Sequence, residues 1–365
     1  MKHDELDLVS KLYQRTIHDP IAEVGRGGTL DGPLVVDLDP TTFCDLACPE
    51  CISGQLLNQG RFTKERLREL VGEFISVGVR AVVLIGGGEP LAHPGTRDVI
   101  RLLGEAGIAV GVVTNGTMLD RHAAELGSYA HWVRVSVDAA TEQTYGRFRP
   151  DRKGRSVFNQ VIENMRGHAA IKTGTLGYSF LLMVRDLPGG GRESNHTEVL
   201  AAARLAKSIG CDYFELKTLF DEQHHIVGLS PEVLESVREQ LAQARDLADD
   251  RFRIVCSSTF ESVDQEVGPT QVKEYATCRT AELRTLVTPS GVYVCSYHRG
   301  ADKARLGDAA TEDFRKIWLD RPRSIIDPSR DCRFHCARHQ TNLEVVHIGR
   351  RPEPPNLVDD YDLFL

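Results

Sequence analysis

The chain has 365 residues, of which 41% are hydrophobic and 26% are charged, and this composition excludes disorder over most of its length. The formal net charge of −8 at pH 7 argues against a protein that binds nucleic acid, because such proteins need a basic surface to release counterions from phosphates. No apolar run approaches the roughly 20 residues that cross a bilayer, and the first residues lack the charged-then-apolar order of a signal peptide. We therefore expect a cytoplasmic protein with no membrane partner.

From Pro33 onward, short apolar strand patterns alternate with helical patterns. The strand patterns are LVVDLD, AVVLIGGGEP, IAVGVVTNG, HWVRVSVDA, LGYSFLLMV and CDYFELKTL. Helical patterns such as KERLRELVGEFISVG and TEVLAAARLAKSIG lie between them. About six βα steps with short connections predict a parallel sheet covered by helices. Because six repeats fall short of the eight of a full barrel, the predicted fold class is α/β, a partial (β/α)6 TIM-like barrel.

The pattern changes after the predicted helix LSPEVLESVREQLAQARDLADD. RTLVTPSGVYVC predicts a β-hairpin with a Pro-Ser-Gly turn, and long helices become rare beyond it. The second part is therefore predicted as a small α+β domain, and we expect the last residues to fold back over the body. The predicted segments are an N-terminal extension over residues 1–32, the partial barrel over 33–250, the second domain over 251–345 and a tail over 346–365.

The nine cysteines are grouped rather than scattered. In a chain without an export signal, disulfides are a poor explanation, because the cytosol keeps thiols reduced. Three cysteines lie between Cys44 and Cys51, and four lie between Cys278 and Cys336. Such groups indicate metal binding. We expect the isolated Cys211 to be a small buried apolar residue.

The first group, Cys44, Cys48 and Cys51, has the spacing CxxxCxxC and directly follows the first predicted strand. Loops at the carboxyl ends of parallel strands build active sites. Three thiolates on one loop can hold three irons of a 4Fe–4S cube and leave the fourth iron open. The alternative is a zinc site, although zinc usually has four closed ligands, and His93 or a distant residue would then be the fourth.

The second group surrounds the predicted hairpin and ends in a CxxxC pair. Four thiolates match a fully ligated iron–sulfur cluster, and a structural zinc site is the alternative. His339 or Cys256 could replace one of the four ligands, and Cys256 could alternatively donate a hydrogen atom to a substrate radical. The predicted ligands are Cys278, Cys295, Cys332 and Cys336.

Four motifs in order, VDLDPTTFCDLACPEC, VLIGGGEPL, VVTNGT and VRVSVDAATEQTYGRFR, resemble the radical S-adenosylmethionine superfamily over roughly residues 34–220. The later TPSGVYVC, LGD and IW segments resemble the SPASM and Twitch auxiliary-cluster domains of such enzymes, and the cysteine number fits the single-cluster Twitch form. The resemblance implies a 4Fe–4S cluster that binds S-adenosylmethionine, the S-adenosylmethionine itself and a second, auxiliary 4Fe–4S cluster. It also implies an electron donor such as flavodoxin or ferredoxin.

The resemblance places S-adenosylmethionine against the ends of the second to fourth strands. Glycines permit close backbone approach, and a carboxylate or carbonyl accepts from the methionine ammonium. The alternatives are that GGGEP is only a tight turn, that Asp138 caps a helix and that Asn115 belongs to a turn. The predicted contacts are Gly86, Gly87, Gly88, Glu89, Pro90, Asn115, Ser136 and Asp138.

Glu50 departs from the family pattern, in which the residue before the third cysteine is usually aromatic or aliphatic and packs beside the adenine. The departure puts the adenine contact in doubt, but not the cluster.

Candidate substrate residues are single polar side chains in or beside the late strands. Glu215 and Lys217 lie two apart and therefore share a face, but they could also form an internal ion pair. The candidates are Tyr178, Arg185, Glu215 and Lys217.

The resemblance implies reductive cleavage of S-adenosylmethionine to a 5′-deoxyadenosyl radical, which abstracts hydrogen from a substrate. A single auxiliary cluster resembles that of radical alcohol dehydrogenases, so we expect an oxidation of a small sugar, aminocyclitol or nucleoside in natural-product biosynthesis. The alternatives are a redox-neutral epimerase, decarboxylase or dehydratase, and a peptide-maturing radical enzyme. A zinc-stabilised α/β binding protein is the non-enzymatic alternative.

Overall fold

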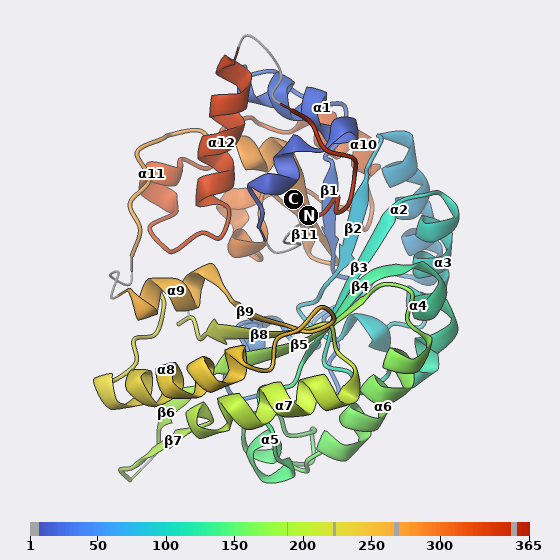
Figure 1. Cartoon of the computed structure of the whole chain (residues 1–365). Helices are drawn as coiled ribbons and strands as arrows, with labels where there is room; N and C mark the ends of the chain where they lie inside the picture. The colour runs from blue at the N-terminus through green and yellow to red at the C-terminus, as the bar shows by residue number, and fades with distance from the viewer. Residues whose placement is uncertain (1–6, 188, 222–223, 266–269, 352–355) are drawn as a thin grey trace.

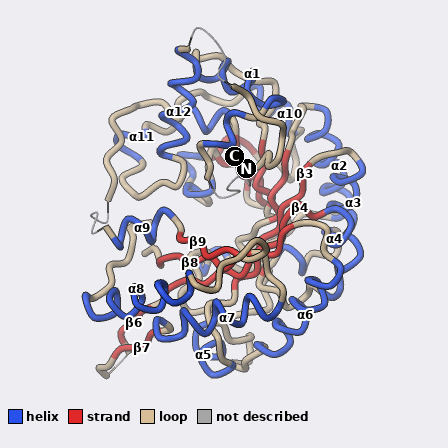
Figure 2. Tube along the Cα trace, viewed as in Figure 1, coloured by secondary structure: helices blue, strands red, loops and turns tan. Residues whose placement is uncertain are grey.

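The dominant feature is one large curved sheet with helices along its outside (Figures 1 and 2). The computed structural model describes residues 7–187, 189–221, 224–265, 270–351 and 356–365. Within these residues the sheet has ten strands in the order β12-β11-β10-β1-β2-β3-β4-β5-β8-β9. The six predicted strands form its parallel centre: β1 (Val35–Leu38), β2 (Ala81–Leu84), β3 (Ala109–Thr114), β4 (Ala130–Ser136), β5 (Thr175–Leu182) and β8 (Tyr213–Thr218). The predicted partial barrel is therefore confirmed.

Two further parallel strands extend this centre, one at each side. On one side, β9 (Arg253–Cys256) pairs with β8, and on the other β10 (Arg284–Thr288) pairs with β1. Beyond β10, the antiparallel β11 (Gly291–Tyr293) completes the predicted hairpin, and β12 (Arg305–Gly307) follows it. The sheet thus crosses the predicted domain boundary at residue 250, and the division of the chain into domains stays a prediction.

The outer face of the sheet is covered by helices that follow the strands in turn (Figure 1). These helices are α2 (Lys64–Ser76), α3 (Thr96–Glu105), α4 (Ala123–Tyr129), α6 (Phe158–Ile171), α7 (Val199–Ile209) and α8 (Pro231–Arg245). Shorter helices lie in the connections: α5 (Glu142–Phe148), α9 (Ser258–Asp264), α10 (Phe314–Asp320) and α11 (Pro328–Asp331). The β5–α7 connection contains a small hairpin of β6 (Val184–Asp186) and β7 (Arg192–Ser194).

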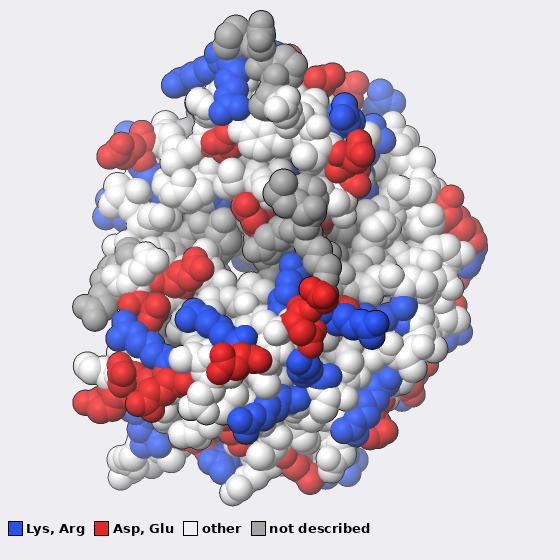
Figure 3. Space-filling view, viewed as in Figure 1, with Lys and Arg blue, Asp and Glu red and all other residues white. Residues whose placement is uncertain are grey.

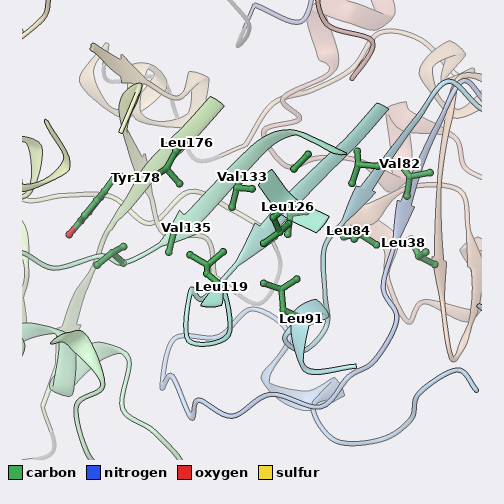
Figure 4. Close-up of a cluster of buried hydrophobic side chains, with 14 of the residues drawn as sticks. Leu38, Val82, Leu84, Leu91, Leu119, Leu126, Val133, Val135, Leu176 and Tyr178 are labelled. Carbon is green, nitrogen blue, oxygen red and sulfur yellow. The ribbon is translucent and has the colours of Figure 1, made fainter. Parts of the chain in front are cut away.

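Helix α2 shows why these segments fold as they do. Its buried residues Leu67, Leu70, Val71 and Phe74 are three or four positions apart and form one apolar stripe. The Thr63 hydroxyl caps the first turn of the helix by accepting from the backbone N–H of Arg66. The stripe packs on aliphatic side chains of the strands, part of which Figure 4 shows.

The inner face of the sheet is closed at its base by the two ends of the described chain. Helix α1 (Arg15–Gly25) crosses α12 (His339–Arg350) at Gly25, where a Cβ atom would lie 2.8 Å from the Cα of Gly349. Phe364 packs against Trp132 on β4, with ring centroids 5.2 Å apart. The tail therefore folds back over the body, as expected.

The surface carries charges of both signs, interspersed over the face seen in Figure 3. Among the described residues, none of the helices has the length and apolar character that a membrane crossing requires.

Truncating Phe364 to alanine tests the tail packing. Because Phe364 is 5% exposed, we expect the free energy of unfolding to fall by about 3 kcal/mol. Urea denaturation followed by circular dichroism measures the change, with Leu319→Ala, at a side chain that is 44% exposed, as the control. Equal losses of unfolding free energy in the two variants would contradict the packing of Phe364 against the body.

Candidate functional site

The cysteine loop leaves the carboxyl end of β1 and is shaped by its own threonines. The Thr42 hydroxyl accepts from the backbone N–H groups of Gln59 and Gly60, at 2.8 and 2.9 Å. The Thr41 hydroxyl accepts from the N–H of Phe43 at 3.0 Å. These bonds fold the segment back so that the three thiols face the strand ends.

The three thiols line a cavity, here called the first cavity, at the carboxyl ends of the parallel strands. Its wall includes all but Pro90 of the predicted cofactor contacts. Its lining contains Cys44, Cys48, Cys51, Gly86, Gly87, Gly88, Glu89, Asn115, Ser136 and Asp138. Residues that were predicted from four different strand ends thus lie around one cavity.

The GGGEP turn lies directly on the cysteine loop. A Cβ atom on Gly88 would lie 2.2 Å from the carbonyl oxygen of Phe43, so the contact requires glycine. The same carbonyl accepts from the N–H of Glu89 at 2.8 Å. The close approach fixes the turn relative to the thiols.

The Glu89 carboxylate joins this turn to the end of β3. It accepts from the Thr114 hydroxyl and the Asn115 N–H, both at 2.7 Å, and from the Leu91 N–H at 3.0 Å. Burial raises the pKa of Glu89 to about 7, although these hydrogen bonds lower it. Its predicted contact with an ammonium group stays a prediction.

Asn115 and Asp138 are both held in place by hydrogen bonds. The Asn115 amide donates to Asp45 at 2.8 Å and lies 3.8 Å from the sulfur of Cys44. Asp138, at a φ of 59°, accepts from the N–H of Leu181 at 2.7 Å. It does not cap the next helix, because Thr141 does so.

Arg149 is a cavity residue that sequence reasoning missed. Its guanidinium pairs with Asp138 at 2.5 Å and lines the first cavity. Burial lowers the pKa of Arg149, but the negative charges of Cys48 and Asp138 together raise it above its usual value. The available signal was the basic residue that ends the VRVSVDAATEQTYGRFR motif.

Glu50 and Arg185 form an ion pair between the cysteine loop and the β6–β7 hairpin. Arg185 donates to Glu50 at 2.9 Å and to Glu193 on β7 at 2.5 Å. Its guanidinium also lies 5.0 Å from the ring centroid of Phe148. Glu50 lines the first cavity, so its charge replaces the expected apolar side chain there.

The prediction that Tyr178 contacts a substrate disagrees with its placement. Its side chain is fully buried on the helix-facing side of the sheet, among the residues of Figure 4. The hydroxyl donates to the carbonyl of Ala139. Tyr178 therefore has a packing role, and its polarity in the strand pattern was misleading.

Glu215 and Lys217 share the inner face of β8, as predicted, and a third residue joins them. The Lys217 ammonium lies 3.4 Å from Glu215, and the Arg134 guanidinium on β4 lies 3.3 Å from the same carboxylate oxygen. Sequence reasoning missed Arg134, although it lies two positions before Ser136 and so has the same strand phase.

The four later thiols line a separate cavity, here called the second cavity, beside β11 and α11. Its lining contains Cys278, Cys295, Cys332 and Cys336, but neither His339 nor Cys256. His339 instead stacks on Tyr275, with ring centroids 5.7 Å apart.

The chemistry of both thiol groups fits a metal cluster. Burial raises the pKa of Cys44 to about 12, and burial together with the Cys336 thiolate raises the pKa of Cys295 to about 12. Thiolates in such places need cationic metal beside them. No set of three Cys, His, Asp or Glu side chains in the described ranges converges closely enough to hold one single metal ion.

One ion pair joins the chain segments beside the two cavities. Arg299, four residues after Cys295, pairs with the buried Asp39 at the end of β1. Asp39 also accepts from the N–H of Gly87 at 2.8 Å. Burial raises the pKa of Asp39, although the Arg299 charge lowers it.

An aromatic contact also lies between the cavities. Phe220 lines the first cavity and Tyr297 lines the second, with ring centroids 6.5 Å apart. The two cavities are therefore neighbours.

The chain resembles known proteins over different lengths. Residues 38–186 match the model of the Radical SAM superfamily. A stretch of 123 residues is 30% identical to an AdoMet-dependent heme synthase from Methanosarcina barkeri (strain Fusaro / DSM 804), over 33% of this chain and 35% of that protein. A stretch of 130 residues is 29% identical to a GTP 3′,8-cyclase from Synechocystis sp. (strain ATCC 27184 / PCC 6803 / Kazusa), over 34% and 38% respectively. The matches thus span little more than a third of these relatives.

Solved structures resemble the fold over a longer part of the chain. SuiB from Streptococcus suis superposes with a TM-score of 0.61 at 14% identity, over 85% of this chain and 71% of SuiB. The structure of anSMEcpe with bound AdoMet gives a TM-score of 0.58 at 16% identity, over 87% of this chain and 97% of anSMEcpe. The likeness in fold therefore extends beyond the matched domain.

Replacing Arg299 with methionine would leave Asp39 buried without its cation. We expect the free energy of unfolding to fall by about 3 kcal/mol, as for one lost partner of a buried ion pair. Urea denaturation measures the loss, and Arg330→Met, at a side chain that is 83% exposed, is the control.

Adding Asp39→Asn to Arg299→Met should recover part of that loss, because the unpaired charge is gone. Strictly additive losses would show that the two residues are not coupled.

Proposed function

We propose that this protein is an enzyme that generates a radical from S-adenosylmethionine at the first cavity. The proposal agrees with the match of residues 38–186 to the model of the Radical SAM superfamily. The observation that carries the proposal is the convergence of three thiols with the GGGEP turn. Cys44, Cys48 and Cys51 would hold a 4Fe–4S cluster. When bound, the cluster and S-adenosylmethionine supply a 5′-deoxyadenosyl radical that abstracts hydrogen from a substrate.

The protein would contribute position and charge at this cavity. Gly88 keeps the turn against the loop, and Glu89 holds the Asn115 backbone in place. The Ser136 hydroxyl faces the cavity, where it could bind a ribose. Arg149, kept beside Cys48 by Asp138, offers a cation for a carboxylate.

The second cavity would hold an auxiliary 4Fe–4S cluster through its four cysteines. His298 has a ring nitrogen 3.3 Å from the sulfur of Cys332, and the Thr280 hydroxyl lies 3.1 Å from the sulfur of Cys278. Such hydrogen bonds tune the potential of a cluster.

We propose a net oxidation of a small polar substrate that lies between the two cavities. The support is that Phe220 and Tyr297 bring the cavities into contact, so an electron from the oxidised substrate has a short path to the second cluster. A sugar, aminocyclitol or nucleoside of natural-product biosynthesis would fit. A redox-neutral reaction on the same substrate class is the alternative.

A peptide is the second candidate substrate class. The structures that share this fold include SuiB bound to its precursor peptide SuiA, at a TM-score of 0.60 and 14% identity.

Anaerobic reconstitution tests the radical chemistry. We expect about eight irons per chain and formation of 5′-deoxyadenosine from S-adenosylmethionine under dithionite. Cys44→Ala should abolish 5′-deoxyadenosine, which chromatography quantifies, while Cys211→Ala, away from both cavities, should retain it. Zinc as the only bound metal would refute the proposal.

Removing one cysteine of the second cavity should show whether the two clusters bind independently. In Cys332→Ala we expect the iron content to fall from about eight to about four per chain. Substrate-independent 5′-deoxyadenosine formation should persist, because the first cavity is intact. Loss of all iron would contradict two independent clusters.

A further inference from the structure

We propose that the substrate carries an anionic group, a carboxylate or a phosphate, which Arg134 and Lys217 bind on the inner face of the barrel. This inference rests on the proposed function and specifies its substrate class. It favours acidic sugars and nucleotides over the cationic aminocyclitols.

The first argument is position. The first cavity is lined by Ser136 on β4 and by Leu219, just beyond the end of β8. Arg134 is two residues before Ser136 and Lys217 is two residues before Leu219, so both side chains project from the same inner face. Lys217 is level with Leu181, which also lines the first cavity, and Arg134 is one step deeper than Ser136. A substrate that reaches from the first cavity into the barrel therefore meets both cations.

The second argument is accessibility. The side chains of Arg134 and Lys217 are 23% and 25% exposed, whereas that of Glu215 is 7% exposed. The cations are thus not sealed in the core, and the carboxylate between them is less exposed than either. The Nε of Arg134 is buried without a hydrogen-bond partner, so the guanidinium has donor capacity that Glu215 does not use.

The third argument is charge. Arg134 and Lys217 both approach the same carboxylate oxygen of Glu215. These three side chains together therefore carry one positive charge in excess. Burial, and after it the like charge of Arg134, lower the pKa of Lys217. Because Arg134 and Lys217 repel each other and share only the Glu215 carboxylate, a second anion beside them would lower their electrostatic energy. This excess is local, because the whole chain has a net charge of −8.

The neighbouring inward-facing cations have other anions. Arg149 pairs with Asp138 beside Cys48, and Arg284 pairs with Asp37 near the second cavity. Among the described residues, the salt bridges of Arg134 and Lys217 both end on Glu215, whereas those of Arg149 and Arg284 end on Asp138 and Asp37. The anion that balances Arg134 and Lys217 is therefore assigned to the substrate.

Calorimetric titration of the reconstituted, S-adenosylmethionine-loaded protein tests the assignment. The probes are inorganic phosphate and, separately, acetate, in chloride buffer. We expect wild type to bind one of them, and Lys217→Met and Arg134→Met each to weaken that binding by about tenfold. Tighter binding of phosphate indicates a phosphorylated substrate, and tighter binding of acetate a carboxylated one. Arg166→Met, on the outer helix α6, should bind as wild type does.

Glu215→Gln separates anion binding from a merely structural network. Removing the competing carboxylate should strengthen binding of the anion by about tenfold, whereas loss of a structural network would weaken it as the cation variants do. Iron content and thermal melting confirm that each variant is folded.

Two results would overturn the inference: no binding of either anion to wild type, or weakened binding in Glu215→Gln. Either result with intact 5′-deoxyadenosine formation leaves the radical chemistry in place. Absence of 5′-deoxyadenosine in wild type would refute the proposed function instead.

Discussion

The buried carboxylate of Asp39 is the constraint on which both cavities depend. A carboxylate that is 1% exposed is costly unless charged and polar groups surround it. Its partners come from distant parts of the chain, namely Arg299 after the second group of cysteines and Gly87 in the turn on β2. The same side chain therefore fixes the cysteine loop, the glycine turn and the C-terminal region relative to one another.

Much of the fold could be predicted because the parallel strands are short apolar runs separated by helical stripes. Their order and the meeting of their carboxyl ends place the three thiols beside Asn115 and Ser136. The pairing of β10 with β1 could not be predicted, since it joins segments about 250 residues apart and no local pattern encodes it. The pair of Arg299 and Asp39 escaped prediction for the same reason.

The errors at the site concern polar side chains in strands. Tyr178 is polar at one atom only, and its ring belongs to the core, so residue type alone misplaced it. Arg134 was detectable from its phase with Ser136, but its partner Glu215 lies on another strand, and sequence order alone does not bring the two together. Glu50 departs from the family pattern, and its charge is accommodated by Arg185, which the sequence suggested as a substrate residue and not as an ion-pair partner.

The shared sheet also determines how the chain can be divided. Because β10 covers one edge of β1, a fragment that ended near residue 250 would expose the backbone N–H and C=O groups of β1 to solvent. An uncovered edge of this kind promotes pairing between molecules and aggregation. The cysteine loop begins directly after that strand, so the first cavity would lose its support as well. We therefore expect a barrel excised near residue 250 to be a poor substitute for the whole chain.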